Sequence, residues 1–117
     1  MNNNKVAIIL CIKDNFEYLG EQLDSIFAQD YKNFDVFLSD DSLTNKVNHI
    51  LKKYRITYLE GPNKGFAVNF ISTLISIPDD YSFYAFADQD DIWLENKLSY
   101  GIDIPVSYTH LTLPTIE

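Results

Sequence analysis

Four short apolar runs alternate with segments of helical periodicity along the chain. The first run, Val6–Ile12, is continuous and rich in β-branched residues, which is typical of a strand that is buried on both faces. Three further apolar runs lie at 34–38, 56–59 and 81–87. The pattern therefore predicts four strands, separated by stretches long enough to hold a helix each.

Between the runs, apolar residues recur every three or four positions, which predicts amphipathic helices. The apolar positions of the first and third predicted helices are Leu19, Leu23, Ile26 and Phe27, and then Phe66, Phe70, Leu74 and Ile77. Another helix is expected over 45–54, and a last one is expected to begin at Ile92. Strands and helices in alternation indicate an α/β, Rossmann-like domain with a mostly parallel sheet and helices on both faces.

Polar residues follow each predicted strand at the point where the strand ends. These residues are Asp14 after the first strand, Asp40 and Asp41 after the second, Asn63 and Lys64 after the third, and Asp88, Asp90 and Asp91 after the fourth. In a parallel sheet all strands point the same way, so residues that follow them collect along one edge. We therefore expect carboxylates that are far apart in sequence to share one crevice.

Crowded carboxylates repel one another unless a cation compensates them, and the chain as a whole carries a net charge of −8. Hard carboxylate oxygens select Mg²⁺ or Mn²⁺, and these ions usually also bind substrate phosphates. If the segment stays extended, Asp88 and Asp90 point to the same side and reach one ion, whereas Asp91 points elsewhere, toward a sugar hydroxyl. The structural alternative is that Asp90 or Asp91 caps the helix at Ile92.

Two of the other candidates, the pair Asp40-Asp41 and Lys64, are open to two interpretations each. The pair Asp40-Asp41 forms either a turn with side-chain-to-backbone hydrogen bonds or a ligand contact. Lys64 belongs either to a simple turn before a helix or to a phosphate site. Cys11 lies within a predicted buried strand and is expected to pack rather than to react. Trp93 follows the acidic cluster and is a candidate wall of the pocket.

Composition excludes several classes of function. The chain has 17 acidic and only 9 basic residues, which argues against binding to nucleic acid, because such binding needs a basic surface. The longest apolar run is far too short to span a bilayer, so no transmembrane segment is predicted. A single cysteine cannot form an internal disulfide, which fits a reducing compartment. The glycine-rich signatures of the common phosphate-binding loops are absent.

Taken in order, the motifs resemble those of family 2 glycosyltransferases with the GT-A fold, especially the bacterial rhamnosyltransferase-like branch. The resemblance covers about residues 5–100. The segments that carry it are Val6–Ile12, 18–26, 29–34, 39–41, 63–70 and 88–94. One departure is that Ile12-Lys13-Asp14 stands where the family usually has Thr-Tyr-Asn, so the tyrosine that stacks on the base is missing.

The resemblance implies a nucleotide-sugar donor, dTDP- or UDP-linked, and a saccharide acceptor in surface polysaccharide synthesis. Asp41 would contact the pyrimidine ring. Asp88-Gln89-Asp90 would be the Asp-x-Asp motif, which binds the ribose and the metal ion on the diphosphate, with Asp91 beside it. Asp14 and Lys64 complete the predicted donor site. The implied location is the cytoplasm, with peripheral attachment of the full-length protein to the inner membrane face.

The end of the chain differs from the rest, because 106–115 resembles a translated sequencing adapter, the alternative being a Thr-rich terminal strand. We therefore expect residues 1–104 to be the N-terminal, nucleotide-binding half of a GT-A domain and 105–117 to be a non-native tail. In inverting members of the family the carboxylate base comes from the later half, so this fragment is expected to bind donor and metal without turnover. Two alternatives are a noncatalytic sugar- or nucleotide-binding module and an Asp-x-Asp phosphatase-like domain, which would carry its motif after the first strand.

Overall fold

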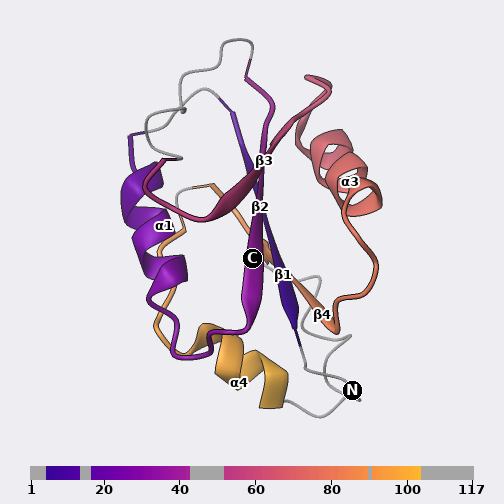
Figure 1. Ribbon diagram of the computed structural model, residues 1–117. Helices are drawn as coiled ribbons and strands as arrows, with labels where there is room; N and C mark the ends of the chain where they lie inside the picture. The colour runs from indigo at the N-terminus through magenta and orange to yellow at the C-terminus, as the bar shows by residue number, and fades with distance from the viewer. Residues whose placement is uncertain (1–4, 14–16, 43–51, 90, 104–117) are drawn as a thin grey trace.

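The computed structural model describes residues 5–13, 17–42, 52–89 and 91–103. Four strands form one sheet in the order β3-β2-β1-β4, and every neighbouring pair is parallel (Figure 1). The strands are β1 (Val6–Ile12), β2 (Phe34–Asp40), β3 (Ile56–Glu60) and β4 (Phe83–Ala87). The predicted α/β class and parallel sheet are therefore confirmed.

Helices cover both faces of this sheet. Helix α1 (Leu19–Phe27) lies on one face and α3 (Phe66–Ser76) on the other, to the left and right of the strands in Figure 1. A short helix, α4 (Lys97–Asp103), follows β4 and lies at the lower end of the sheet in the same view. The helix predicted over 45–54 falls almost wholly outside the described residues, as does the predicted tail.

The central strand β1 supplies side chains to two separate apolar clusters. Its even-numbered residues, such as Ile8 and Leu10, pack with α1. Its odd-numbered residues, such as Ile9 and Cys11, join a smaller cluster with Ile77, on the side of α3. Successive side chains of a strand point to opposite faces, so a continuous apolar run is what a strand covered on both sides requires. The seven residues of β1 are all buried, as its sequence predicts.

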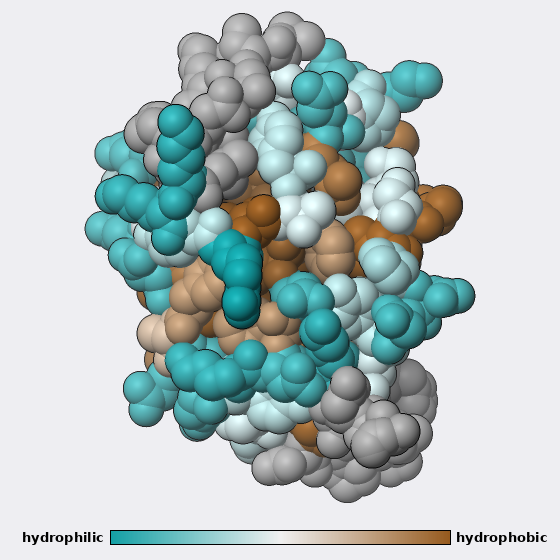
Figure 2. Space-filling model, in the orientation of Figure 1, coloured by the Kyte–Doolittle hydropathy of each residue, from teal (hydrophilic) through white to brown (hydrophobic). Residues whose placement is uncertain are grey.

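Helix α3 differs from its predicted orientation. Its buried residues are Asn69 and Thr73, whereas Phe66 and Leu74 of the predicted apolar stripe are exposed. Apolar atoms are accordingly visible at the side of the molecule where α3 lies (Figure 2). The stripe is thus wrong in part, because the side chain of Asn69 pairs with Ser39 of the sheet and turns this polar face inward.

The segment after β4 also differs from its prediction. The last helix begins at Lys97 and not at Ile92, so Asp91 does not cap a helix there. Trp93 is buried in the cluster between α1 and β1. None of the helices among the described residues is long and apolar enough to cross a membrane.

The two-sided burial of β1 predicts a large difference between chemically identical substitutions. Ile8 is 0% exposed and Ile75 is 76% exposed. We expect Ile8→Ala to lower the free energy of unfolding by about 2–5 kcal/mol, because it leaves a cavity in the core. Ile75→Ala should change it by less than about 0.5 kcal/mol. Urea denaturation followed by circular dichroism measures both, and equal losses would contradict this description of the core.

Candidate functional site

The carboxyl ends of the strands are joined by backbone hydrogen bonds at one edge of the sheet. The N–H of Asp41 donates to the carbonyl of Ile12 at 2.8 Å, which ties the end of β2 to the end of β1. The N–H of Lys13 donates to Oε1 of Gln89 at 3.0 Å, which ties the end of β1 to the segment after β4. Segments that are 76 residues apart in sequence therefore meet directly.

Asp41 is buried at this edge, with its two carboxylate oxygens in different situations. Oδ1 accepts a short hydrogen bond from the N–H of Asn63 in the loop after β3. Oδ2 is also buried but has no hydrogen-bond partner among the described residues. A buried carboxylate oxygen without a partner is costly, by about 1–3 kcal/mol or more. Such an atom is therefore a candidate to receive a hydrogen bond from a ligand.

The loop after β3 is shaped to approach this carboxylate. A Cβ at Gly61 would lie 2.5 Å from Oδ1 of Asp41 and 2.7 Å from Oδ1 of Asn69, so only glycine fits. Asn63 has a φ of 57°, in the left-handed region that asparagine tolerates better than most residues. Both positions follow from the close passage of the backbone over Asp41.

Asp40, the neighbour of Asp41, has protein partners on both oxygens. Its Oδ1 accepts from the N–H of Ser42 at 2.9 Å, and its Oδ2 accepts from the hydroxyl of Tyr58 at 3.2 Å. Burial and the nearby Asp40 carboxylate raise the pKa of Tyr58 to about 12. The first interpretation of this pair, a turn with side-chain-to-backbone hydrogen bonds, describes Asp40. Asp41 is the member of the pair whose Oδ2 has no hydrogen-bond partner among the described residues.

Asn69 is a residue of this site to which the sequence pattern assigned no role. It is buried on α3, accepts a 2.5 Å hydrogen bond from the hydroxyl of Ser39, and donates to the Ser39 carbonyl at 3.3 Å. Its carbonyl accepts from the Thr73 hydroxyl at 2.8 Å. The available signal was the spacing of Asn69 and Thr73, two polar residues one turn apart in a mostly apolar helix.

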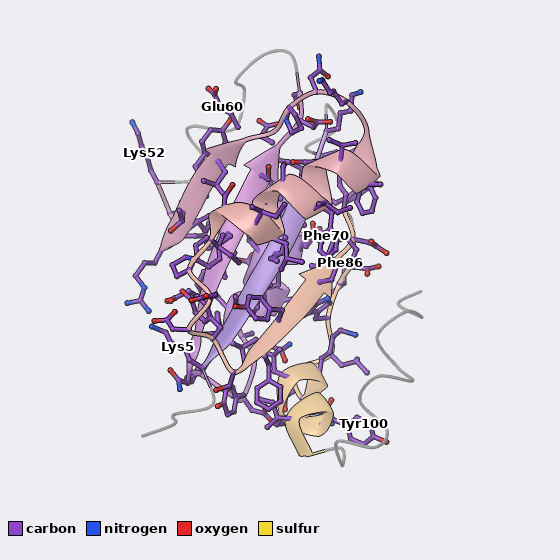
Figure 3. All side chains as sticks on the ribbon, turned by 90° about the vertical axis from the view of Figure 1, so that its right-hand side faces the viewer. Lys5, Lys52, Glu60, Phe70, Phe86 and Tyr100 are labelled. Atoms are coloured by element: carbon purple, nitrogen blue, oxygen red, sulfur yellow. The ribbon has the colours of Figure 1, made fainter. Side chains whose placement is uncertain are left out.

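A small pocket, with roughly 300 Å³ of space partly open to solvent, lies at this edge. Its lining residues are Cys11, Ile12, Lys13, Asp41, Phe66, Asn69 and Gln89. Phe66 of α3 is the aromatic residue that lines this pocket. Phe66 and Phe70 both contact Phe86 of β4. Figure 3 shows Phe70 and Phe86 lying against each other, with ring centroids 4.1 Å apart. Gln89, like Asn69, was not predicted to contribute to a site.

Two of the predicted carboxylates, Asp41 and Asp88, both affect the pKa of the Cys11 thiol. Burial, together with the negative charges of Asp41 and Asp88, raises the pKa of its thiol to about 12, and a hydrogen bond with Thr73 opposes this rise. The thiol is therefore protonated at neutral pH and packs in the sheet, as predicted. Asp41 and Asp88 follow different strands, and both lie close enough to influence one side chain.

The other predicted site residues lie around this edge or outside the described residues. Asp88 is half-buried and Asp91 is exposed, and the N–H of Asp91 donates to the Asp88 carbonyl at 3.1 Å. This hydrogen bond closes a turn, so the segment is not extended as expected. Lys64 is exposed in the loop before α3. Asp14 and Asp90 lie outside the described residues.

Two further findings concern a metal and the pocket wall. Within the described part of the chain, no group of three or more His, Cys, Asp or Glu side chains is arranged to hold a metal ion. Trp93 packs in the core and does not line the pocket around Asp41, so its predicted place in the wall is wrong.

Relatives of known class match most of this chain. dTDP-rhamnosyl transferase RfbG of Shigella flexneri is 32% identical over 95 residues, which cover 74% of this chain and 33% of RfbG. Glycosyltransferase GlyA of Streptococcus pneumoniae is 31% identical over 98 residues, covering 80% of this chain and 14% of GlyA. The chain thus spans a third or less of the length of these two relatives.

Solved structures share the fold. Staphylococcus aureus TarS, in complex with UDP-GlcNAc, superposes with a TM-score of 0.66 at 24% identity, over 84% of this chain and 30% of TarS. The mannosyltransferase PcManGT of Pyrobaculum calidifontis, in complex with GDP-Man and Mn²⁺, gives 0.67 at 18% identity, over 84% of this chain and 31% of that one. At these identities the likeness concerns the fold, which is that of GT-A enzymes.

The family profile described as Glycosyl transferase family 2 matches residues 7–103, which include β2, β3, β4, all of β1 except Val6, and the edge where the strands end. The motif resemblance, the relatives and the fold agree with this match. The chain belongs to glycosyl transferase family 2.

Proposed function

We propose that the chain is the donor-binding part of a glycosyltransferase that uses a pyrimidine nucleotide sugar and a divalent metal ion. The observation that carries this proposal is the buried, unpartnered Oδ2 of Asp41 beside a pocket at the edge where Asp88 also lies. The saccharide acceptor and the role in surface polysaccharide synthesis are part of the proposal and rest on the resemblance.

The base is recognised through Asp41. Uracil and thymine carry an N3–H group, which can donate to the free Oδ2 and satisfy it. Cytosine carries a bare nitrogen at the same place, which would face the carboxylate as a second acceptor. The residues that line the pocket beside Asp41 include Phe66 and Ile12, whose apolar side chains suit the faces of a flat ring. A uracil or thymine donor, UDP- or dTDP-linked, therefore fits the described groups.

In this proposal Asp88 and Asp90 would hold the metal ion together with the diphosphate of the donor. Mg²⁺ and Mn²⁺ are commonly bound by one or two carboxylates and complete their coordination with phosphate oxygens and water. A site of this kind needs no group of three protein ligands, and none is found among the described residues. The turn between Asp88 and Asp91 can therefore supply the protein part of the site. When bound, the ion offsets charge on the leaving nucleoside diphosphate.

The remaining predicted residues have supporting roles in this proposal. Lys64, exposed in the loop that also approaches Asp41, adds positive charge near the donor phosphates. Asp91 lies beside the acidic turn and is available to a sugar hydroxyl. Asp14 is proposed to border the same edge because it follows β1. Donor and metal binding, rather than turnover, is the property we expect of the 117-residue chain.

Base selectivity tests the role of Asp41. We expect UDP and dTDP, with Mn²⁺ present, to bind at least tenfold more tightly than CDP, because a hydrogen bond to a charged acceptor contributes about 1.5–3 kcal/mol. Asp41→Asn should weaken UDP binding and narrow the ratio of UDP to CDP affinity, since its amide can donate to cytosine. Calorimetric titration of the three nucleotides measures this ratio.

The matched control is Asp40→Asn, one residue away and equally buried. Both oxygens of Asp40 have partners in the protein, so this variant should lose stability and keep the ratio of UDP to CDP affinity. A wild-type chain that binds CDP as tightly as UDP would refute the role of Asp41.

Metal dependence tests the acidic turn. UDP affinity should fall at least tenfold when Mn²⁺ is replaced by EDTA, and Asp90→Ala or Asp88→Asn should remove most of this difference. The control is Asp79→Asn, an exposed aspartate that precedes β4 and therefore lies toward the opposite edge of the sheet. Equal metal dependence in Asp90→Ala and in the unmutated chain would count decisively against this assignment.

A further inference from the structure

Helix α1 carries polar side chains on the face that it turns toward the segment after β4. Gln22 is 0% exposed although it lies among the apolar residues Leu19, Leu23 and Ile26 of the same buried face. A fully buried amide is expected to have hydrogen-bond partners. In this structure the Nε2 of Gln22 and the hydroxyl of the nearby Ser25 each bind backbone of the segment after β4, more than 60 residues further along the chain.

Gln22 holds the first residue of that segment. Its Nε2 donates to the carbonyl of Asp88 at 2.5 Å. The same carbonyl accepts the N–H of Asp91, the hydrogen bond that closes the acidic turn. A carbonyl oxygen has two lone pairs, so one atom of Asp88 both closes the turn and anchors it to α1.

Ser25 holds the chain at Trp93, two residues beyond the end of the turn. Its hydroxyl donates to the carbonyl of Gln22 at 2.7 Å and accepts the N–H of Trp93 at 3.0 Å. The indole of Trp93 packs in the apolar cluster between α1 and β1. The backbone is therefore fixed on both sides of the turn, at Asp88 and at Trp93, while the side chain of Asp91 remains exposed.

A third polar residue, Gln29, binds the backbone at Leu94 and Leu98, later in the sequence than the acidic turn. Its Nε2 donates to the carbonyl of Leu94 at 2.6 Å, and its Oε1 accepts the N–H of Leu98 at 3.0 Å. The chain that leads from β4 to α4 runs alongside α1 in Figure 1, in agreement with these contacts. Gln29 thus holds Leu94 and the start of α4, which lie three or more residues beyond Asp91, and its Nε2 also donates to the Ser25 carbonyl at 3.3 Å.

We propose that Gln22 and Ser25 are positioning residues that hold the acidic turn in the geometry that receives the metal and the diphosphate. This inference rests on the proposed function. Three of the four residues at 88–91 are aspartates, whose mutual repulsion would spread an untethered loop. A tethered backbone removes the ordering cost from the binding step. Residues that orient metal-binding groups typically change metal affinity by about 10–100-fold when they are replaced.

The experiment measures the Mn²⁺ concentration for half-maximal binding of UDP by the 117-residue chain. Gln22→Met keeps the length of the side chain and removes its hydrogen bonds, and Ser25→Ala removes one oxygen atom. We expect each to raise the required Mn²⁺ concentration about tenfold. The ratio of UDP to CDP affinity, which reports on Asp41, should stay unchanged. General loss of structure would alter both quantities.

Gln29→Met is the control, because it removes the same kind of buried amide from the same face of the molecule. It should lower the melting temperature and leave the Mn²⁺ requirement unchanged. Unchanged Mn²⁺ requirements in Gln22→Met and Ser25→Ala, or an equal increase in Gln29→Met, would overturn the positioning role. Should Gln22→Met fail to fold, Ser25→Ala decides alone. Absence of Mn²⁺-dependent UDP binding by the unmutated chain would overturn the proposed function as well.

Discussion

The hydrogen bond between the Asp41 carboxylate and the backbone of Asn63 joins the ends of β2 and β3 beside the end of β1. It depends on Gly61, because any side chain there would occupy the space of the carboxylate. It also leaves the second oxygen of Asp41 buried and without a partner among the described residues. The rest of the proposed donor site is arranged around this oxygen, because the parallel sheet directs every strand end to the same edge.

Two elements of different character border the proposed site. The Asp41 side is built into the sheet, where the ladder of β1 and β2 and the pair formed by Ser39 and Asn69 fix it. The acidic segment lies outside the sheet and has no ladder of its own, so side chains of α1 hold its backbone. Helix α1 therefore serves two purposes: its apolar residues cover β1, and its polar residues hold the chain after β4.

The sequence was sufficient to predict the sheet and its shared edge, because a short, continuous apolar run such as Val6–Ile12 has no polar face to turn to solvent and must be covered on both sides. It was not sufficient for α3, where the pairing of Asn69 with Ser39, 30 residues away, decides which face is buried. Periodicity reports how apolar a face is and gives no information on such a distant polar partner. The start of α4 and the place of Trp93 were missed for the same reason, since contacts with Ser25 and Gln29 determine them.

The central claim is that aspartates from distant parts of the sequence bind one donor and one metal ion at a single edge. NMR of the UDP-bound chain with substoichiometric Mn²⁺ tests it directly, because the paramagnetic ion broadens the signals of nearby amides. We predict broadening of Lys13, Asn63, Gln89 and Asp91 together, while Asn33 and Ser82, at the opposite edge, stay sharp. Broadening confined to the acidic turn, with Lys13 and Asn63 unaffected, would contradict the account.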